Sequence, residues 1–316
     1  MKILVTGGAG FIGSHIVDSY IELGHQVVVV DNLSTGRREN LNPQAEFHQE
    51  DIQDEQMETL FETHRFDVVN HQAAQMDVRR SVSDPKYDAK NNILGILNIL
   101  QNCVKYGTQK FIFSSTGGAV YGEQDYFPAD EEHPTWPVSP YGISKLAGEK
   151  YLYYYKEVHN LQHVILRYAN VYGPRQNPHG EAGVVAIFTE RLLKGEQPII
   201  NGDGTQTRDY VFVGDVVRAN GKALAYEKSD IFNVGTGVET DVNEMFALLN
   251  RYTEAGKGET HGPAKPGEQL RSCLSFAKAE KILNWRPEVE LKEGLRRTVE
   301  YFAKQKQLLT QRGLRC

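Results

Sequence analysis

Two side chains four positions apart, Tyr141 and Lys145, are the pair in this sequence whose types and spacing best suit catalysis. On a helix, residues four apart lie on one face with their side chains close together. A phenol normally ionises near pH ~10, so it acts as a base at neutral pH only where a neighbouring cation favours the phenolate. Lys145 is expected to be that cation. The pair predicts removal of a proton from a substrate alcohol, as in alcohol oxidation.

A run of hydroxyl residues precedes the pair. Residues 110–113 predict a strand, and Ser114, Ser115 and Thr116 follow it directly. The hydroxyl of Ser115 or of Thr116 is placed to hydrogen-bond to the substrate oxygen as the proton leaves. A tyrosine and a lysine at this spacing also occur by chance on surface helices, so the interpretation depends on a hydride acceptor elsewhere in the chain.

Ser139 and Pro140 indicate where the helix that carries the pair begins. A serine at the N-cap accepts a hydrogen bond from the first turn, and proline suits that turn because no backbone donor is needed there. We therefore predict a helix that starts here and continues over residues 143–159.

The first 31 residues predict the site for a hydride acceptor. Residues 2–6 read as a buried strand, residues 14–23 as a helix and residues 26–30 as a second buried strand. The turn after the first strand carries Gly7, Gly10 and Gly13. These glycines let the backbone approach a pyrophosphate at the helix N-terminus. Asp31 ends the second strand, where it is placed to accept hydrogen bonds from an adenosine ribose.

The acid at position 31 also indicates which dinucleotide binds. A carboxylate beside the ribose repels a 2′-phosphate, so NAD is favoured over NADP. Arg37 and Arg38 follow closely in the sequence and are the residues that would favour NADP. NADP therefore stays open as the alternative.

Strands and helices alternate as far as residue 170, which predicts an α/β fold with a doubly wound parallel sheet of the Rossmann type. Beyond residue 170 the composition shifts toward loops, with helices expected at 184–195, 216–226, 242–252, 278–284 and 293–306. We expect a dinucleotide-binding domain over residues 1–169, completed by a segment near 209–235. Residues 170–316 are expected to form a smaller α/β substrate-binding domain, with residues 305–316 as a frayed tail.

Composition narrows the function classes. The chain has 316 residues, a formal charge of −6 and a pI of about 6.0. This net negative charge does not favour binding to nucleic acid or to an anionic membrane. Cys103, Cys273 and Cys316 are far apart and lack metal-ligand spacing, so we expect reduced thiols, a cytoplasmic location and no metal. No secretory signal and no membrane span is expected.

Together these motifs resemble the extended short-chain dehydrogenase/reductases. The resemblance also covers a set of further segments: Asp31 to Gly36, Asp51-Ile52, His71 to Gln75, Asn92 with Gly95, Val120-Tyr121-Gly122, 166–175, 208–211 and 284–287. It extends over nearly the whole chain. Within the superfamily the chain is most similar to the UDP-glucose 4-epimerase group of sugar-nucleotide enzymes.

The resemblance implies a residue set for each ligand. For NAD the set is Gly7, Gly10, Phe11, Ile12, Gly13, Asp31, Asn32, Ser34, Thr35, Gly36, Asp51, Ile52, Ala73, Ala74, Gln75, Asn92, Ser114, Tyr141 and Lys145. For a UDP-sugar it is Thr116, Tyr141, Asn170, Asn201, Arg208, Arg271 and Ser272.

The resemblance also implies a role for each part of these sets. Tyr141 would be the base, Lys145 would hold the nicotinamide ribose, and Thr116 would bond to the sugar oxygen. Asn170 and the two arginines would hold the diphosphate. Ser272 would leave room beside the sugar's C2 substituent, which is compatible with N-acetylhexosamines.

The implied reaction is NAD-dependent 4-epimerisation of a UDP-hexose through a transient 4-keto sugar, with glucose and galactose, and then their N-acetyl forms, as the candidate sugars. Related dehydratases and decarboxylases need an acid just after the hydroxyl, where this chain has Gly117, Gly118 and Ala119. The alternatives are a UDP-glucuronate 4-epimerase, a nucleotide-sugar dehydrogenase or reductase, and a non-catalytic NAD-binding sensor.

The chain departs from the family pattern at one position. Three residues, rather than the usual two, separate Thr116 from Val120-Tyr121-Gly122. Either the loop bulges at its glycines, or Ser115 takes the role of the assisting hydroxyl.

The expected helices 91–106 and 143–159 carry more apolar surface than one sheet face needs. Relatives commonly dimerise through these helices, so a homodimer is expected. The alternative is that both helices pack only on their own sheet.

Overall fold

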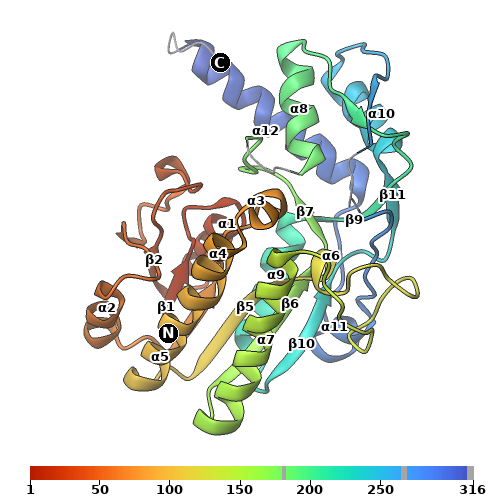
Figure 1. Cartoon of the computed structure of the whole chain (residues 1–316). Helices are drawn as coiled ribbons and strands as arrows, with labels where there is room; N and C mark the ends of the chain where they lie inside the picture. Colours follow the sequence, from red (N-terminus) through yellow and green to blue (C-terminus); the bar gives the residue numbers. More distant parts are fainter. Residues whose placement is uncertain (180–182, 265–268, 312–316) are drawn as a thin grey trace.

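The structure is a computed structural model that describes residues 1–179, 183–264 and 269–311. Its centre is a seven-stranded parallel sheet with the strand order β10-β6-β5-β4-β1-β2-β3 (Figure 1). The strands are β1 (Lys2–Thr6), β2 (Gln26–Val30), β3 (Glu46–His48), β4 (Val68–His71), β5 (Lys110–Thr116), β6 (Gln162–Tyr168) and β10 (Asp230–Val234). The doubly wound α/β fold predicted from the sequence is confirmed.

Helices cover both faces of this sheet because its strands are apolar on both sides. On β1, Ile3 and Val5 belong to one core cluster and Leu4 to the other, as the two-residue repeat of a strand requires. The first cluster contains α1 (Phe11–Glu22) and α9 (Val213–Ala225). The second contains α2 (Gln56–His64), α5 (Gly95–Tyr106) and α7 (Pro140–His159).

The strand order reverses between β1 and β4. From β1 the chain builds outward to β2 and β3, then returns to the other side of β1 for β4, β5 and β6. In open α/β sheets, ligands bind at the carboxyl ends of the strands at such a switch point. The loops after β1, β4 and β5 are therefore where a site is expected.

A second group of elements packs beyond the carboxyl ends of the sheet (Figure 1). It contains α8 (Val184–Lys194), α10 (Val242–Thr253), α12 (Leu291–Gln311) and a small sheet of β7 (Asn170–Tyr172), β9 (Thr207–Phe212) and β11 (Glu239–Asp241). These elements share their own apolar core. Between them the chain returns once to the central sheet through α9 and β10.

The remaining elements are short. They are η1 (Arg38–Asn40), α3 (Val78–Ser83), α4 (Pro85–Ala89), the π-helical turn η2 (Lys90–Leu94), α6 (Gly117–Val120), β8 (Ile200–Asn201), β12 (His261–Gly262) and α11 (Ala277–Leu283). The sequence analysis did not anticipate α3 and α4. Their signal is an aspartate N-cap on each: Asp77 accepts from the Arg80 N–H and Asp84 from the Tyr87 N–H.

The predicted start of the helix that carries Tyr141 and Lys145 is confirmed. α7 begins at Pro140, and the Ser139 hydroxyl oxygen accepts from the Gly142 N–H at 3.1 Å. The prediction for the C-terminus was wrong, because α12 continues through Gln311 instead of fraying from residue 305. Its last turns are largely exposed, so they carry no apolar periodicity, yet they are rich in Lys, Gln and Leu, which favour helix. Residues 312–316, including Cys316, lie outside the described residues.

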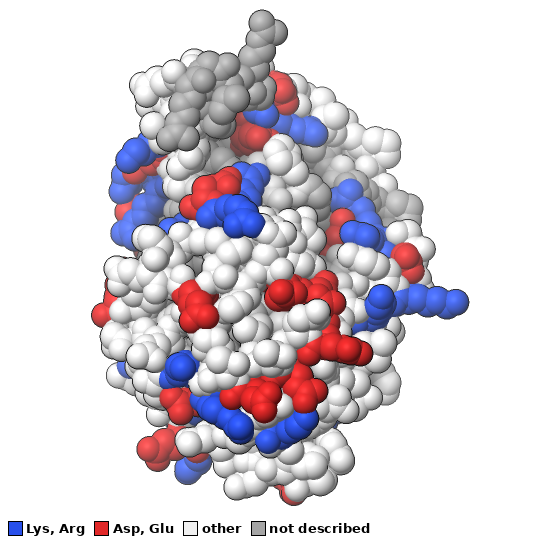
Figure 2. Space-filling view, turned by 90° about the vertical axis from the view of Figure 1, so that its left-hand side faces the viewer, with Lys and Arg blue, Asp and Glu red and all other residues white. Residues whose placement is uncertain are grey.

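The surface carries both signs of charge. On the face shown in Figure 2, acidic and basic side chains lie next to one another between uncharged areas. In the part of the chain that the structure describes, no helix combines the length and the apolar composition needed to cross a membrane.

Candidate active site

The predicted site residues of the N-terminal half gather at the carboxyl ends of β1, β2, β4 and β5. At the end of β1, Gly7 has a φ of 69°, and a Cβ there would lie 2.7 Å from the Ala73 backbone nitrogen. A Cβ on Gly13 would lie 2.2 Å from the Gly7 carbonyl oxygen. Only glycine fits these positions, so the turn closes tightly against the loop that follows β4.

This turn leads into an open helix N-terminus. Gly10 is the N-cap of α1 and supplies no side-chain cap to the first turn. With no side chain above it, the backbone N–H groups of Phe11, Ile12 and Gly13 form a cradle that suits the pyrophosphate of a dinucleotide.

The Asp31 carboxylate at the end of β2 is fixed by two backbone donors. Its oxygens accept from the Ala9 N–H at 3.0 Å and the Leu33 N–H at 2.8 Å. Burial raises the pKa of Asp31, while both hydrogen bonds lower it. A Cβ on Gly36 would come within 2.7 Å of this carboxylate, so glycine keeps the space around it open. The remaining lone pairs suit the two hydroxyls of an adenosine ribose.

The two arginines that would favour NADP point to other partners. The Arg37 guanidinium lies 3.4 Å from the Asn177 side-chain oxygen and 3.9 Å from Glu39. Arg38 lies over the ring of Phe47 and donates to Gln49. The donor set around Asp31 therefore fits NAD better than NADP.

Further residues of the set expected to bind NAD lie beside Asp31. The Asn32 amide donates to the Asp51 carboxylate at 2.8 Å, and the Asn32 carbonyl oxygen accepts from the Ser34 N–H at 2.9 Å. Thr35 follows in the same loop. Ile52 packs against Gly95 of α5, where a Cβ would lie 2.6 Å from its side chain. Gly95 thus makes room for the Ile52 side chain at the N-terminal end of α5.

Asn92 holds the loop that follows β4. Its side-chain oxygen accepts from the Gln75 N–H and its amide donates to the Gln75 carbonyl, each at 2.8 Å. The same amide lies 3.2 Å from the Ser144 hydroxyl on α7. Asn92 thereby fixes the backbone of the Ala73 to Gln75 loop, a positioning role that its sequence spacing alone did not specify.

Tyr141 and Lys145 meet as predicted on one face of α7. The Lys145 ammonium lies 6.0 Å from the centre of the Tyr141 ring and donates to the Ser114 carbonyl at 2.9 Å. Burial lowers the pKa of Lys145 to about 8, and the negative charges of Asp88 and Glu149 partly oppose this shift. A cation held so close to the phenol favours its ionised form, which is the condition for Tyr141 to act as a base.

The two candidate hydroxyls have different surroundings. The Ser115 side chain is 3% exposed and donates to the Glu149 carboxylate at 2.5 Å. Thr116 is half-buried, and a Cβ placed on Gly118 would lie 3.8 Å from its hydroxyl oxygen. The same point lies 3.8 Å from the Asn170 side-chain oxygen and 4.0 Å from the Ser272 hydroxyl. Thr116, Asn170 and Ser272 therefore surround Gly118.

The extra residue after Thr116 is absorbed by regular structure. Gly117 to Val120 form the helical turn α6 directly at the end of β5, rather than a bulged loop. A Cβ on Gly117 would lie 2.4 Å from the side chain of Leu274, so glycine is required for α6 to pack there. Side chains of the C-terminal segment thereby reach the end of β5.

A buried charged network behind the site was not predicted from the sequence. Arg167 of β6 donates to Glu149 of α7 at 2.6 and 3.0 Å and to the Tyr121 hydroxyl at 2.9 Å. Tyr121 in turn donates to Asn233 of β10 at 2.8 Å. The available signal was the position of Glu149, four residues after Lys145 on the buried face of α7.

The arginines expected to bind a diphosphate both have partners within the protein. Arg208 on β9 donates to the Thr207 carbonyl at 2.7 Å. Arg271 pairs with Glu239 at 2.6 and 2.9 Å and lies over the ring of Phe127. The Asp209 N–H donates to the Ser272 carbonyl at 2.9 Å, so the two arginine-bearing segments run side by side.

Asn201 and His71 are two further polar residues that were singled out from the sequence. Asn201 is half-buried on β8, where its carbonyl accepts from Gln206. His71 is 2% exposed and shares a hydrogen bond of 2.9 Å with Thr6. Burial, together with the charge of Lys145, lowers the pKa of His71 to about 3, so the imidazole is neutral.

Comparisons with known proteins agree with this geometry. The model of the NAD dependent epimerase/dehydratase family matches residues 3–235. A putative UDP-glucose 4-epimerase of Methanocaldococcus jannaschii is 51% identical over 301 residues, 95% of this chain and 97% of that protein.

Two solved structures are similar over nearly the whole chain. The UDP-glucose 4-epimerase of Thermotoga maritima with UDP-glucose is 53% identical with a TM-score of 0.95, covering 96% of this chain and 99% of that one. The UDP-glucose 4-epimerase of Thermus thermophilus in complex with NAD is 47% identical with a TM-score of 0.91, again covering 96% and 99%.

Replacing Lys145 by methionine is expected to stabilise the cofactor-free protein at pH 7. Burial lowers the pKa of Lys145 from 10.5 to about 8, so between those values the unfolded chain binds a proton that the folded chain does not. The wild-type free energy of unfolding should therefore rise with pH across this window. The advantage of the variant, about 1–3 kcal/mol below pH 8, should shrink across the same window.

Urea unfolding at pH 7 and pH 10 measures this difference. Lys150→Met, which removes an exposed lysine from the same helix, is the control and should match wild type. A Lys145→Met variant that is less stable than wild type at pH 7 would contradict the burial cost assigned to this ammonium.

Proposed function

The chain belongs to the NAD-dependent epimerase/dehydratase family, and from that premise we propose that it is a UDP-hexose 4-epimerase that interconverts UDP-glucose and UDP-galactose. The observation that carries the proposal is the grouping of Tyr141, Lys145 and Thr116 at the carboxyl end of β5. Relatives named UDP-glucose 4-epimerase are 44–51% identical over almost the whole chain. The uronate epimerase, net dehydrogenase or reductase, and non-catalytic sensor alternatives are less favoured.

NAD is the cofactor of this family, and the residues at the switch point fit it. The glycine turn and the α1 N-terminus would hold the pyrophosphate, Asp31 the adenosine ribose, and Lys145 the nicotinamide ribose. When bound, NAD supplies the acceptor and later the donor for the hydride at C4 of the sugar.

Tyr141 carries out the proton transfer. The ammonium of Lys145 favours its phenolate, which takes the proton from the C4 hydroxyl and later returns it. The hydroxyl of Thr116 donates to the same oxygen and stabilises the charge that develops there. No acid stands among Gly117, Gly118 and Ala119 to drive elimination or decarboxylation, which supports a reaction that leaves the carbon skeleton intact.

Inversion at C4 requires the 4-keto sugar to present its other face before it is reduced. A site that does this must hold the nucleotide firmly and the sugar loosely. We assign the diphosphate to Arg208, Arg271 and Asn170, and the uracil to the segment that contains Asn201. Gly117 and Gly118 offer the sugar few side-chain contacts, which leaves it room to turn.

This assignment divides the chain by role. We propose that residues 1–169, together with residues 209–235, hold NAD, since β10 belongs to the central sheet and α9 packs on it. The rest of 170–316 would hold the UDP-sugar. Arg271 is neutralised by Glu239 in this structure, so a bound diphosphate would compete with that ion pair.

We also propose that two copies of the chain associate through α5 and α7. Exposed apolar side chains recur at helical spacing on α7, at Ile143, Tyr151, Tyr154 and Val158, and on the neighbouring segment at Leu94 and Val104. The two helices lie next to one another on one face of the sheet (Figure 1). A symmetric four-helix contact would bury both rows. Sedimentation as a monomer would contradict this assignment.

A cytoplasmic location is proposed as well. It is supported by Cys103 and Cys273, which are both buried free thiols. Chemical labelling of denatured protein isolated from its own cells tests it, because disulfide-bonded cysteines would contradict a reducing compartment.

The wild-type protein should interconvert UDP-glucose and UDP-galactose with no added oxidant, and Tyr141→Phe should lower kcat at least ~100-fold because the base is removed. Tyr153→Phe, which changes an exposed tyrosine of the same helix, should leave kcat unchanged. NMR of the product sugars measures both. Retained activity in Tyr141→Phe would reject the base, and a requirement for stoichiometric NAD or NADH would indicate a net dehydrogenase or reductase.

Substitution of the two hydroxyls should separate catalysis from stability. Thr116→Val should lower kcat by roughly 100-fold because a donor to the developing charge is lost. Ser115→Ala should change kcat only a few-fold but destabilise the fold by about 1–3 kcal/mol, since Glu149 loses a buried donor. Turnover assays and urea unfolding of both variants decide the matter, and the opposite pattern would assign the catalytic hydroxyl to Ser115.

The space beside Ser272 should set the tolerance for a C2 substituent. In Ser272→Tyr the ratio of kcat/KM for UDP-GlcNAc to that for UDP-glucose should fall at least ~10-fold, because the ring fills the room that an N-acetyl group needs. Ser272→Ala, which keeps the site small, should preserve the ratio. Equal loss on both substrates in the tyrosine variant would reject this role.

A further inference from the structure

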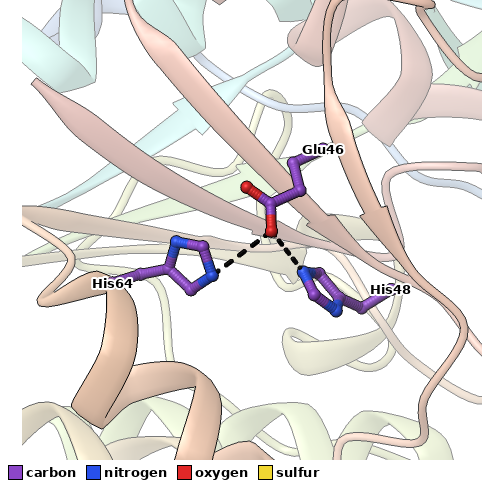
Figure 3. A group of neighbouring side chains, drawn as sticks. All are labelled: Glu46, His48 and His64. Carbon is purple, nitrogen blue, oxygen red and sulfur yellow. Dashed lines mark hydrogen bonds and ion pairs between the residues drawn. The ribbon is translucent and has the colours of Figure 1, made fainter.

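Three side chains with metal-binding atoms converge at the edge of the central sheet. Glu46 and His48 lie on β3, and His64 ends α2. One Glu46 oxygen lies 2.8 Å from the His48 Nε2 and 3.4 Å from the His64 Nε2 (Figure 3). All three potential ligand atoms are within 4.8 Å of one another.

The fold brings these residues together by ordinary packing. Glu46 pairs with Val28 of β2 and His48 with Val30, so all four side chains lie on the same face of the sheet. Val28 and Val30 belong to the core cluster that also contains residues of α2. The last turn of that helix therefore ends over Glu46 and His48. His64 is held there by parallel stacking on Phe66, at 5.4 Å between ring centres.

We propose that Glu46, His48 and His64 bind one divalent transition-metal ion, with Zn²⁺ as the best match. Two imidazole nitrogens and a carboxylate oxygen form a typical zinc donor set, and water can complete a tetrahedron. With metal–ligand bonds of about 2.0–2.2 Å, neighbouring ligand atoms in a tetrahedron lie about 3.3–3.5 Å apart. The present separations approach that geometry, and small side-chain movements would reach it.

The electrostatics of the cluster are compatible with this ion. A cation here lies at the C-terminal end of the α2 dipole, which is favourable. Lys2 is the opposing charge, since it lines the same cavity of about 480 Å³ as Glu46 and His64. That cavity provides a path for the ion.

A bound ion would join β3 to the end of α2. The chain between His48 and His64 carries Asp51 and Ile52, which belong to the set of residues expected to bind NAD. A metal that binds the folded state and closes this segment stabilises the protein by mass action. The expected effect is a rise in Tm with Zn²⁺ concentration, independent of turnover.

The test uses tag-free, full-length protein treated with chelator and then titrated with Zn²⁺ against a chromophoric chelator. Wild type should bind one ion at this site, and Glu46→Gln, His48→Gln and His64→Gln should each weaken binding at least ~10-fold. The control is His261→Gln, since His261 faces Glu259 at 3.6 Å without belonging to a three-residue cluster among the described residues. It should bind Zn²⁺ like wild type.

Two further measurements guard against misfolded variants. Each variant should match wild type in Tm without metal to within a few degrees, and at a Zn²⁺ concentration near the wild-type Kd the three cluster variants should gain much less stability than wild type and His261→Gln. Co²⁺ added to wild type should produce the intense visible bands of a four-coordinate site. Zn²⁺ affinity that is unchanged in all three cluster variants, or a weak six-coordinate Co²⁺ spectrum, would overturn the proposal and leave a hydrogen-bonded His–Glu cluster.

Discussion

The arrangement of the active site depends on one buried cation. The ammonium of Lys145 is almost fully removed from water, so its charge is costly, and the Ser114 carbonyl is the partner that holds it in place. This contact joins α7 to the end of β5, and it holds the ammonium 6.0 Å from the centre of the Tyr141 ring. The same desolvation that lowers the pKa of Lys145 strengthens its effect on the phenol, because no solvent screens the interaction. Burial of the Lys145 ammonium therefore lowers the stability of the fold at the position where the proposed chemistry needs a cation.

A second buried charge system supports this contact from behind. Glu149, Arg167, Tyr121 and Asn233 connect α7, β6, the segment after α6 and β10 by direct hydrogen bonds. Arg167 keeps its charge because the Glu149 carboxylate and the Tyr121 hydroxyl offset its loss of hydration. Ser115 belongs to this network, whereas Thr116, one residue further along β5, faces Gly118, Asn170 and Ser272. Because successive side chains of a strand point to opposite faces, Ser115 joins the buried network while Thr116 points toward Gly118, as its proposed role at the substrate requires.

Two regions of the central sheet carry separate groups of polar side chains. The carboxyl ends of β1, β4 and β5 hold the residues proposed for the cofactor and for proton transfer, and the C-terminal elements reach these strand ends through Leu274 and Ser272. The cluster of Glu46, His48 and His64 lies at the side of the sheet, on the edge strand β3 and the last turn of α2. A ligand bound there would act on the segment that leads to Asp51, and so on the cofactor end of the site, without touching the sugar.

Local sequence signals determined much of this protein. The glycine turn, the acid at Asp31, the Ser139 cap and the four-residue spacing of Tyr141 and Lys145 are short-range features. The α/β fold, the family and the placement of Tyr141 and Lys145 on one face of a helix could therefore be predicted. Contacts between distant segments could not. The different surroundings of Ser115 and Thr116 depend on Glu149 and on the packing of α6, and α6 requires Leu274 beside Gly117. The meeting of His48 with His64, and of Arg271 with Glu239, follows from packing between elements, which sequence spacing does not encode.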